Sequence, residues 1–80
     1  MTNDINKIEA AVFRRIVHHF RENTEIQNID IMETAGFCRN CLSRWYSEEA
    51  NKLGVNITEE SSKEIVYGMP YKDWKEKFQR

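Results

Sequence analysis

Cys38 and Cys41 form a Cys-x-x-Cys pair, and they are the only two cysteines in the 80-residue chain. Residues three positions apart lie on one face of a helix, so both sulfurs can point toward the same spot. Two thiols placed in this way can bind a metal ion, exchange electrons as a dithiol, or fill space in a hydrophobic core. These three possibilities make different demands on the rest of the chain.

A zinc site needs four ligands in a tetrahedron, and cysteine and histidine are common ligands. The pair supplies two of them, and the sequence has no second Cys-x-x-Cys and no spaced histidine pair. The missing ligands would have to be His19 or His18, the carboxylate of Glu9, or the same two cysteines of a symmetry-related copy. The candidate metal ligands are therefore Cys38, Cys41, His19 and Glu9, with zinc as the candidate metal.

Thiol redox chemistry is the alternative interpretation, with Cys38 as the attacking thiolate and Cys41 as its resolving partner. The dipole at a helix N-terminus stabilises a thiolate, and Gly36 and Arg39 suggest that Cys38 lies near such an end. Helical peroxidases of the alkyl hydroperoxide D type use a comparable pair, but in them a histidine follows the second cysteine by four residues. Trp45 occupies that position here, so their general acid–base group is missing.

The composition describes one small domain that spans residues 1–80. The chain has 13 acidic and 12 basic residues, so it lacks the basic footprint that is typical of nucleic-acid binders. No apolar run approaches the roughly 20 residues of a membrane span, and the polar N-terminus has no signal-peptide core. We therefore expect a cytoplasmic protein with reduced thiols. Because so short a chain builds a thin core, we also expect a homo-oligomer.

Apolar residues recur at helical spacing along the chain, and no run alternates as a β-strand does. The expected helices cover residues 4–22, 28–35, 37–53 and 58–68, followed by a short helix that Pro70 opens. Glycines 36, 54 and 68 mark helix ends, and Thr58 is a favourable N-cap. This pattern predicts an all-α protein, a compact bundle of four to five short helices with no sheet.

The first expected helix carries a wide apolar stripe, formed by Ile5, Ile8, Val12, Ile16 and Phe20. On a helical projection Glu9 falls inside this stripe and His19 falls at its edge. A histidine in such a place is more often a core or interface group than a ligand. The position of Glu9 is explained by a helix that is exposed there, by an ion pair with Arg39 or Arg44, or by a functional cleft.

Both thiols also lie on the apolar face expected for the third helix, together with Phe37, Leu42, Trp45, Tyr46 and Leu53. Free cysteine behaves as a small hydrophobic residue and is among the most buried residue types. The pattern therefore favours packing of Cys38 and Cys41 in the core.

Three blocks of the chain occur in order at a characteristic spacing. They are Gln27-Asn28-Ile29-Asp30, then Ala35-Gly36-Phe37-Cys38-Arg39-Asn40-Cys41-Leu42-Ser43 with Trp45-Tyr46, and Glu64-Ile65-Val66-Tyr67-Gly68-Met69-Pro70-Tyr71 with Trp74-Lys75. In these blocks the chain resembles a bacterial family known as domain of unknown function 1244. The resemblance implies a compact all-helical cytoplasmic protein, and it implies no reaction, ligand or partner.

The sequence thus predicts a non-enzymatic binding or interaction module whose Cys38/Cys41 face is either packed core or a metal site. A thiol oxidoreductase that uses Cys38 and Cys41 is the alternative. We expect no membrane partner and no nucleic-acid partner. The hypotheses differ in geometry, because redox chemistry needs an accessible Cys38, core packing buries both sulfurs, and a metal site needs two more ligands.

Overall fold

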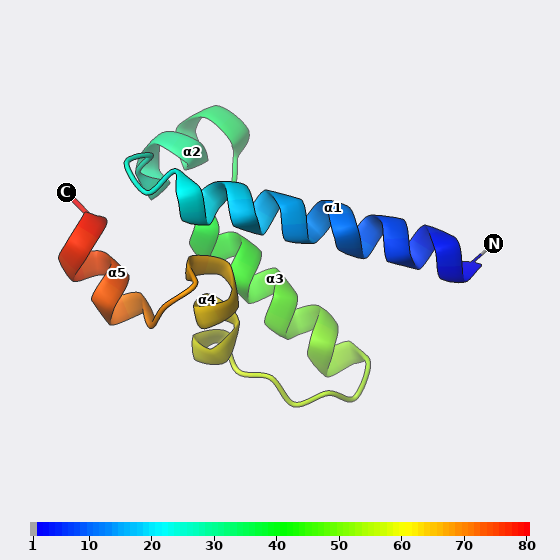
Figure 1. Cartoon of the computed structure of the whole chain (residues 1–80). Coiled ribbons are helices and arrows are strands. Elements are labelled where there is room, and N and C mark those ends of the chain that lie inside the picture. Colours follow the sequence, from blue (N-terminus) through cyan, green and yellow to red (C-terminus); the bar gives the residue numbers. More distant parts are fainter. Residues whose placement is uncertain (1) are drawn as a thin grey trace.

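The computed structural model describes residues 2–80, and over this range it contains five α-helices and no strand (Figure 1). The helices are α1 (Thr2–Glu22), α2 (Asn28–Ala35), α3 (Arg39–Lys52), α4 (Glu59–Tyr67) and α5 (Tyr71–Phe78). The predicted all-α class is confirmed, and each helix begins and ends within two residues of its expected bounds. None of the described helices is long and apolar enough to cross a membrane.

Local capping sets most of these boundaries. Thr58 accepts a hydrogen bond from the backbone N–H of Ser61 at 3.1 Å and so caps the start of α4. Gly36 and Gly68 follow α2 and α4 with φ of 78°, a left-handed conformation that glycine adopts without strain. Pro70 is the N-cap of α5 and not its first helical residue.

The hydrophobic core lies where α4 and α5 meet α3. Val66, Tyr67 and Trp74 are its buried members, and Leu42, Met69, Tyr71 and Phe78 pack around them. The rings of Tyr67 and Trp74 lie 5.0 Å apart in a tilted arrangement. Large aromatic side chains thus provide most of the buried volume of a small core.

The face of α3 that is buried is small and polar. Ser43 and Ser47 of α3 and Ser62 of α4 are buried, and α4 is the helix that α3 contacts most extensively. Each hydroxyl donates to a backbone carbonyl at 2.6 to 2.9 Å, so no polar group is left unpaired. Trp45 and Leu53, which were expected on the apolar face of α3, are 42% and 82% exposed, so that part of the face is not buried in the chain.

The N-terminal half of α1 extends away from the other helices (Figure 1). Ile5, Ile8, Val12 and Ile16 of its apolar stripe are between 43% and 62% exposed. Within the described residues of α1, only Val17 is buried. The globule formed by the remaining helices therefore leaves this stripe without a partner in the chain.

The close contact of α4 with α3 at their buried serines predicts that a larger side chain there destabilises the fold. Replacing Ser62 with Leu inserts three carbon atoms where α4 meets its neighbours, and such overpacking typically costs about 1–3 kcal/mol. We expect Ser62→Leu to lower the free energy of unfolding by that amount in urea denaturation. The matched control is Ser61→Leu, which changes an exposed neighbour on the same helix. Equal stabilities of the two variants would contradict the close helix contact.

Candidate functional site

The two cysteines meet at the start of α3. Cys38 is the N-cap of this helix in an extended conformation, and Cys41 lies in its first turn. Their sulfur atoms are 3.9 Å apart, and both residues are free thiols. Cys38 is only 7% exposed, whereas Cys41 is partly exposed. The pair therefore lies at a helix N-terminus as expected, but its buried member is the one that the redox hypothesis needs to be accessible.

The other predicted metal ligands lie elsewhere. Glu9 and His19 are exposed on α1, and the His19 ring contacts the side chain of Asn23. Among residues 2–80, no group of three or more His, Cys, Asp or Glu side chains is placed to hold a metal ion. The sulfur separation is close to the ~3.8 Å that divides two thiolates on one tetrahedral zinc. The pair thus has the geometry of half a zinc site, and the chain does not bring the other half to it.

Arg39, which follows Cys38 directly, is buried, with 1% of its surface exposed. One guanidinium nitrogen donates to the carbonyl of Ile26 at 2.7 Å and to Oδ1 of Asn28 at 3.1 Å. The other donates to the carbonyls of Phe20 at 3.3 Å and Asn23 at 2.9 Å. A single side chain of α3 thereby joins the end of α1, the following loop and the start of α2.

The charge of Arg39 has no carboxylate partner. The four ion pairs found in residues 2–80 do not include it. Its guanidinium carbon lies 5.2 Å from the ring centre of Phe20 and 4.9 Å from that of Trp74, within cation–π range. Burial lowers the pKa of Arg39 from its ordinary value, yet a guanidinium remains charged in proteins. The ion pair suggested for Glu9 is not formed, because Arg44 pairs with Glu48 and Arg39 binds neutral oxygens.

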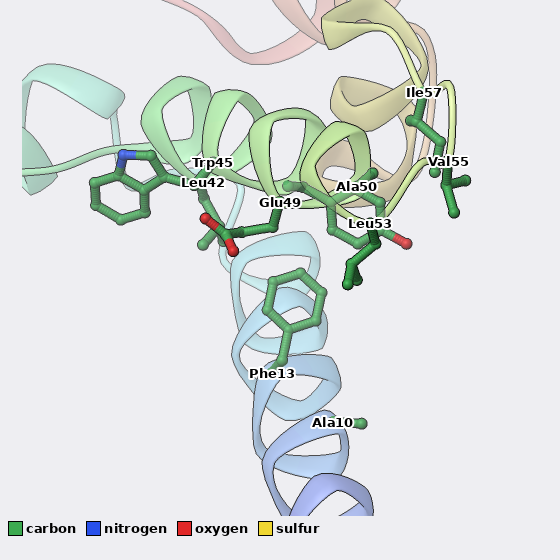
Figure 2. Close-up of a pocket in the computed structure, with 10 residues that line it drawn as sticks. Ala10, Phe13, Leu42, Trp45, Glu49, Ala50, Leu53, Val55 and Ile57 are labelled. Atoms are coloured by element: carbon green, nitrogen blue, oxygen red, sulfur yellow. The ribbon is translucent and has the colours of Figure 1, made fainter.

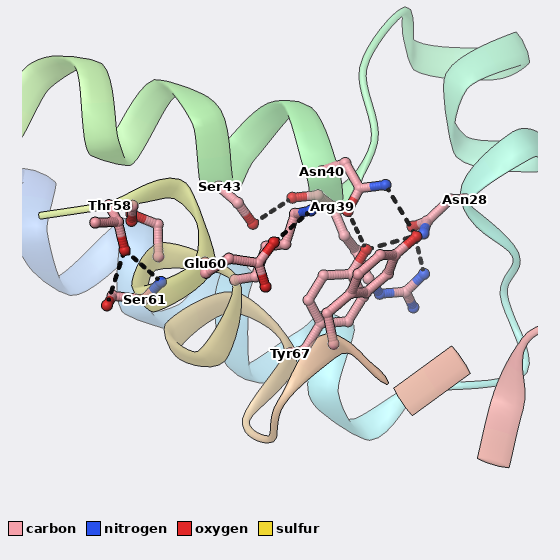
Figure 3. A network of polar contacts seen from close by, with 11 residues as sticks. Asn28, Arg39, Asn40, Ser43, Thr58, Glu60, Ser61 and Tyr67 are labelled. Carbon is pink, nitrogen blue, oxygen red and sulfur yellow. Dashed lines mark hydrogen bonds and ion pairs between the residues drawn. The ribbon is translucent and has the colours of Figure 1, made fainter. Parts of the chain in front are cut away.

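A row of polar side chains continues from Arg39 (Figure 3). Asn28 Nδ2 donates to the hydroxyl of Tyr67 at 3.0 Å, and this hydroxyl donates to Oδ1 of Asn40 at 2.7 Å. Tyr67 is 2% exposed, and burial raises its pKa well above the ordinary value of 10. Sequence reasoning missed this network. Its only signal was a set of asparagines and an arginine beside apolar residues, with no spacing that predicts their contact.

A groove of about 590 Å³ lies between α1, α3 and the segment that follows α3 (Figure 2). Its walls are almost entirely apolar and include Phe13, Leu42, Trp45, Leu53 and Val55. Leu42, Trp45 and Leu53, which were expected on one apolar face with the thiols, thus line a hollow at the surface.

The sequence profile of the family described as "Protein of unknown function (DUF1244)" matches residues 26–80. The chain belongs to this family. The part that matches DUF1244 holds α2 to α5, both cysteines and all of the Arg39 network except the carbonyls of Phe20 in α1 and Asn23 just after it. The entire apolar stripe of α1 therefore lies before the DUF1244 match. A search of curated proteins finds no match to the chain.

The Arg39 contacts predict a large loss of stability when they are removed. Within residues 2–80, Arg39→Leu removes the guanidinium donor from four partly buried acceptors, of which only the Asn23 carbonyl keeps a second donor, the backbone N–H of Ile26. An acceptor left unpaired in the interior typically costs about 1–3 kcal/mol. We expect the free energy of unfolding to fall by at least ~3 kcal/mol in urea denaturation. Arg44→Leu is the control on an exposed turn of the same helix and should change it by less than ~1 kcal/mol. A similar loss in both variants would contradict the special role of Arg39.

Proposed function

We propose that the protein is a non-enzymatic interaction module that acts as a homo-oligomer in the cytoplasm. The observation that carries this proposal is the apolar stripe of α1, whose isoleucines and valine are about half exposed with no partner in the chain. Monomeric proteins rarely expose continuous apolar patches of this kind unless they bind something there.

The total surface area supports association. The chain exposes 5883 Å², whereas a compact monomer of its 9.6 kDa mass is expected to expose about 5,100 Å². The excess of about 800 Å² equals the area that each partner buries in an interface of standard size. A second copy that covers α1 would therefore restore the surface expected for a folded protein of this mass.

The shape of the surface suits a two-fold contact between copies. The stripe of α1 is a ridge, and the groove beside it, with Trp45, Leu53 and Val55, is a hollow of the same apolar character. In a symmetric dimer the ridge of each copy can enter the hollow of the other. Glu49 is the only charged side chain that lines the groove, so little charge would be buried.

Two alternative roles of the thiol pair, core packing and a zinc site shared between subunits, agree with this proposal. Cys38, at 7% exposure, is packed at the start of α3. Alternatively, Cys38 and Cys41 of two copies could supply the four ligands of one zinc ion at a contact between subunits, since 3.9 Å suits two ligands of one tetrahedron. His19 and Glu9 remain weaker candidates because they are exposed and apart from the thiols.

A thiol oxidoreductase is the second candidate, and the 3.9 Å sulfur separation at a helix N-terminus is the observation that favours it. In this reaction the two thiols would lose two electrons and two protons and form a disulfide, while a disulfide substrate would be reduced to two thiols. The more exposed Cys41 would make the first attack, and Cys38 would resolve the mixed disulfide.

Association is tested by reversing the polarity of the stripe. We expect the wild type to sediment at twice its monomer mass, and Ile8→Glu to sediment as a monomer, because a carboxylate would be buried in an apolar contact. Lys7→Glu, on the neighbouring polar face of α1, is the matched control and should remain dimeric. A wild-type protein that stays monomeric at millimolar concentration would rule out the homo-oligomer.

The role of the thiols is tested by native mass spectrometry combined with thiol titration. In the leading proposal Cys41 reacts readily with a thiol reagent, Cys38 reacts only after unfolding, and no internal disulfide accumulates in a glutathione buffer. One zinc per two chains that is lost in Cys41→Ser would assign the metal role. Reduction of a small disulfide substrate by the wild type, but not by Cys41→Ser, would instead establish the oxidoreductase.

A further inference from the structure

A second cavity of about 350 Å³ lies among the first turns of α2, α3 and α5. Its polar lining comes from Asn28 of α2, Asn40 of α3, Tyr71 of α5 and the chain end at Gln79 and Arg80. We call it the Asn40–Tyr71 cavity. Its volume is near the lower end of the range of small-molecule sites. None of the roles considered above uses it.

The hydrogen bonds that lead to this cavity have a fixed direction. Arg39 can only donate, so the Asn28 atom that it contacts must be the carbonyl oxygen. The amide nitrogen of Asn28 then donates to Tyr67, and the Tyr67 hydroxyl donates to the carbonyl oxygen of Asn40. This leaves the amide nitrogen of Asn40 directed at the hydroxyl of Tyr71, at 3.4 Å.

The chain of donors ends in the cavity without an acceptor. None of the hydrogen bonds found in residues 2–80 uses the Tyr71 hydroxyl as a donor. The side-chain carbonyls of Asn28 and Asn40 already accept bonds, and so does that of Gln27, from the backbone N–H of Arg80. The free donors at the cavity are the Tyr71 O–H and the remaining N–H groups of the two asparagines, whereas each of these side-chain carbonyls has already used one of its two lone pairs. Such a lining fits a ligand that supplies acceptor atoms.

The charges around the cavity favour an anionic ligand. The buried guanidinium of Arg39 stands at the start of the hydrogen-bond chain and has no carboxylate partner in residues 2–80. The ammonium groups of Lys63 and Lys75 lie 4.5 and 4.9 Å from the centre of the Tyr71 ring, although Lys63 also pairs with Glu60. Among the described residues, Arg80 is the only charged side chain that lines the cavity itself, and Arg39, Lys63 and Lys75 do not line it. Directed hydrogen bonds polarise one another, so the positive charge of Arg39 strengthens the terminal donor.

We propose that the Asn40–Tyr71 cavity binds a small anion, a carboxylate or a phosphate, which accepts a hydrogen bond from the Tyr71 hydroxyl and from the amide of Asn40. Arg80 lies at the rim, where its guanidinium is held by the carbonyl of Glu25 and keeps further donors free. This site is independent of the surface proposed for association.

The test is a titration of the full chain with inorganic phosphate and, separately, with succinate, at ionic strength held constant with chloride. We expect saturable shifts of the Asn40 side-chain amide and the Trp74 indole resonances with at least one of the two anions. Comparison of phosphate with succinate distinguishes the two ligand chemistries. Absence of a saturable shift with either anion would overturn the proposal.

Variants locate the binding. Tyr71→Phe keeps the ring and removes the terminal donor, so we expect about tenfold weaker binding. Arg80→Gln removes a charge at the rim and leaves the core unchanged, so it should also weaken anion binding. Tyr46→Phe is the matched control, because Tyr46 lines the apolar groove and not this cavity, and its affinity should equal that of the wild type. Unchanged binding in both Tyr71→Phe and Arg80→Gln would show that the anion binds elsewhere and would overturn the proposal.

Discussion

The fold depends on one buried positive charge. The C-terminal carbonyls of a helix have no partners within the helix and carry its negative dipole end. The guanidinium of Arg39 meets this end of α1 at the carbonyl of Phe20 and then reaches Asn23, Ile26 and Asn28 beyond it. Four neutral oxygens and two aromatic faces thus take the place of a carboxylate. The turn from α1 to α2 is built around this side chain, and the core ring of Trp74 lies against it.

The helices could be predicted from sequence because their signals are local. Glycine in a left-handed conformation ends α2 and α4, and Thr58 caps α4 by a bond to a backbone N–H three residues away. The packing could not be predicted in the same way. The apolar pattern of α3 shows which face is hydrophobic, but it does not show that α3 buries Ser43 and Ser47 instead. Ser43 bonds to the carbonyl of Arg39 in its own helix, and Ser47 bonds to that of Ile57 in the segment after α3. Small hydroxyl residues whose partners are backbone carbonyls look like surface residues in a sequence.

In the candidate site, too, the local features could be predicted from sequence and the contacts between distant residues could not. The spacing of Cys38 and Cys41 correctly predicts that the two sulfurs lie close together. Cys38, however, is the extended N-cap of α3 and not a helical residue, which the spacing does not show. The unequal exposure of the two cysteines depends on neighbours that are distant in the sequence. Arg39 was noted only as a nearby charge or a partner of Glu9, because nothing local indicates that its partners are backbone carbonyls of residues 20 to 26. The polar row through Tyr67 joins residues up to 39 positions apart and has no sequence period.

The exposed beginning of α1 has a thermodynamic consequence. Before Phe13 this helix has no buried residue among those the structure describes, so its backbone is held by little more than its own hydrogen bonds. Isolated helical segments of this length are marginal in water. Ordering of this segment and its association with a second copy are then one coupled equilibrium, in which helix content rises with protein concentration and the segment frays when the chains separate.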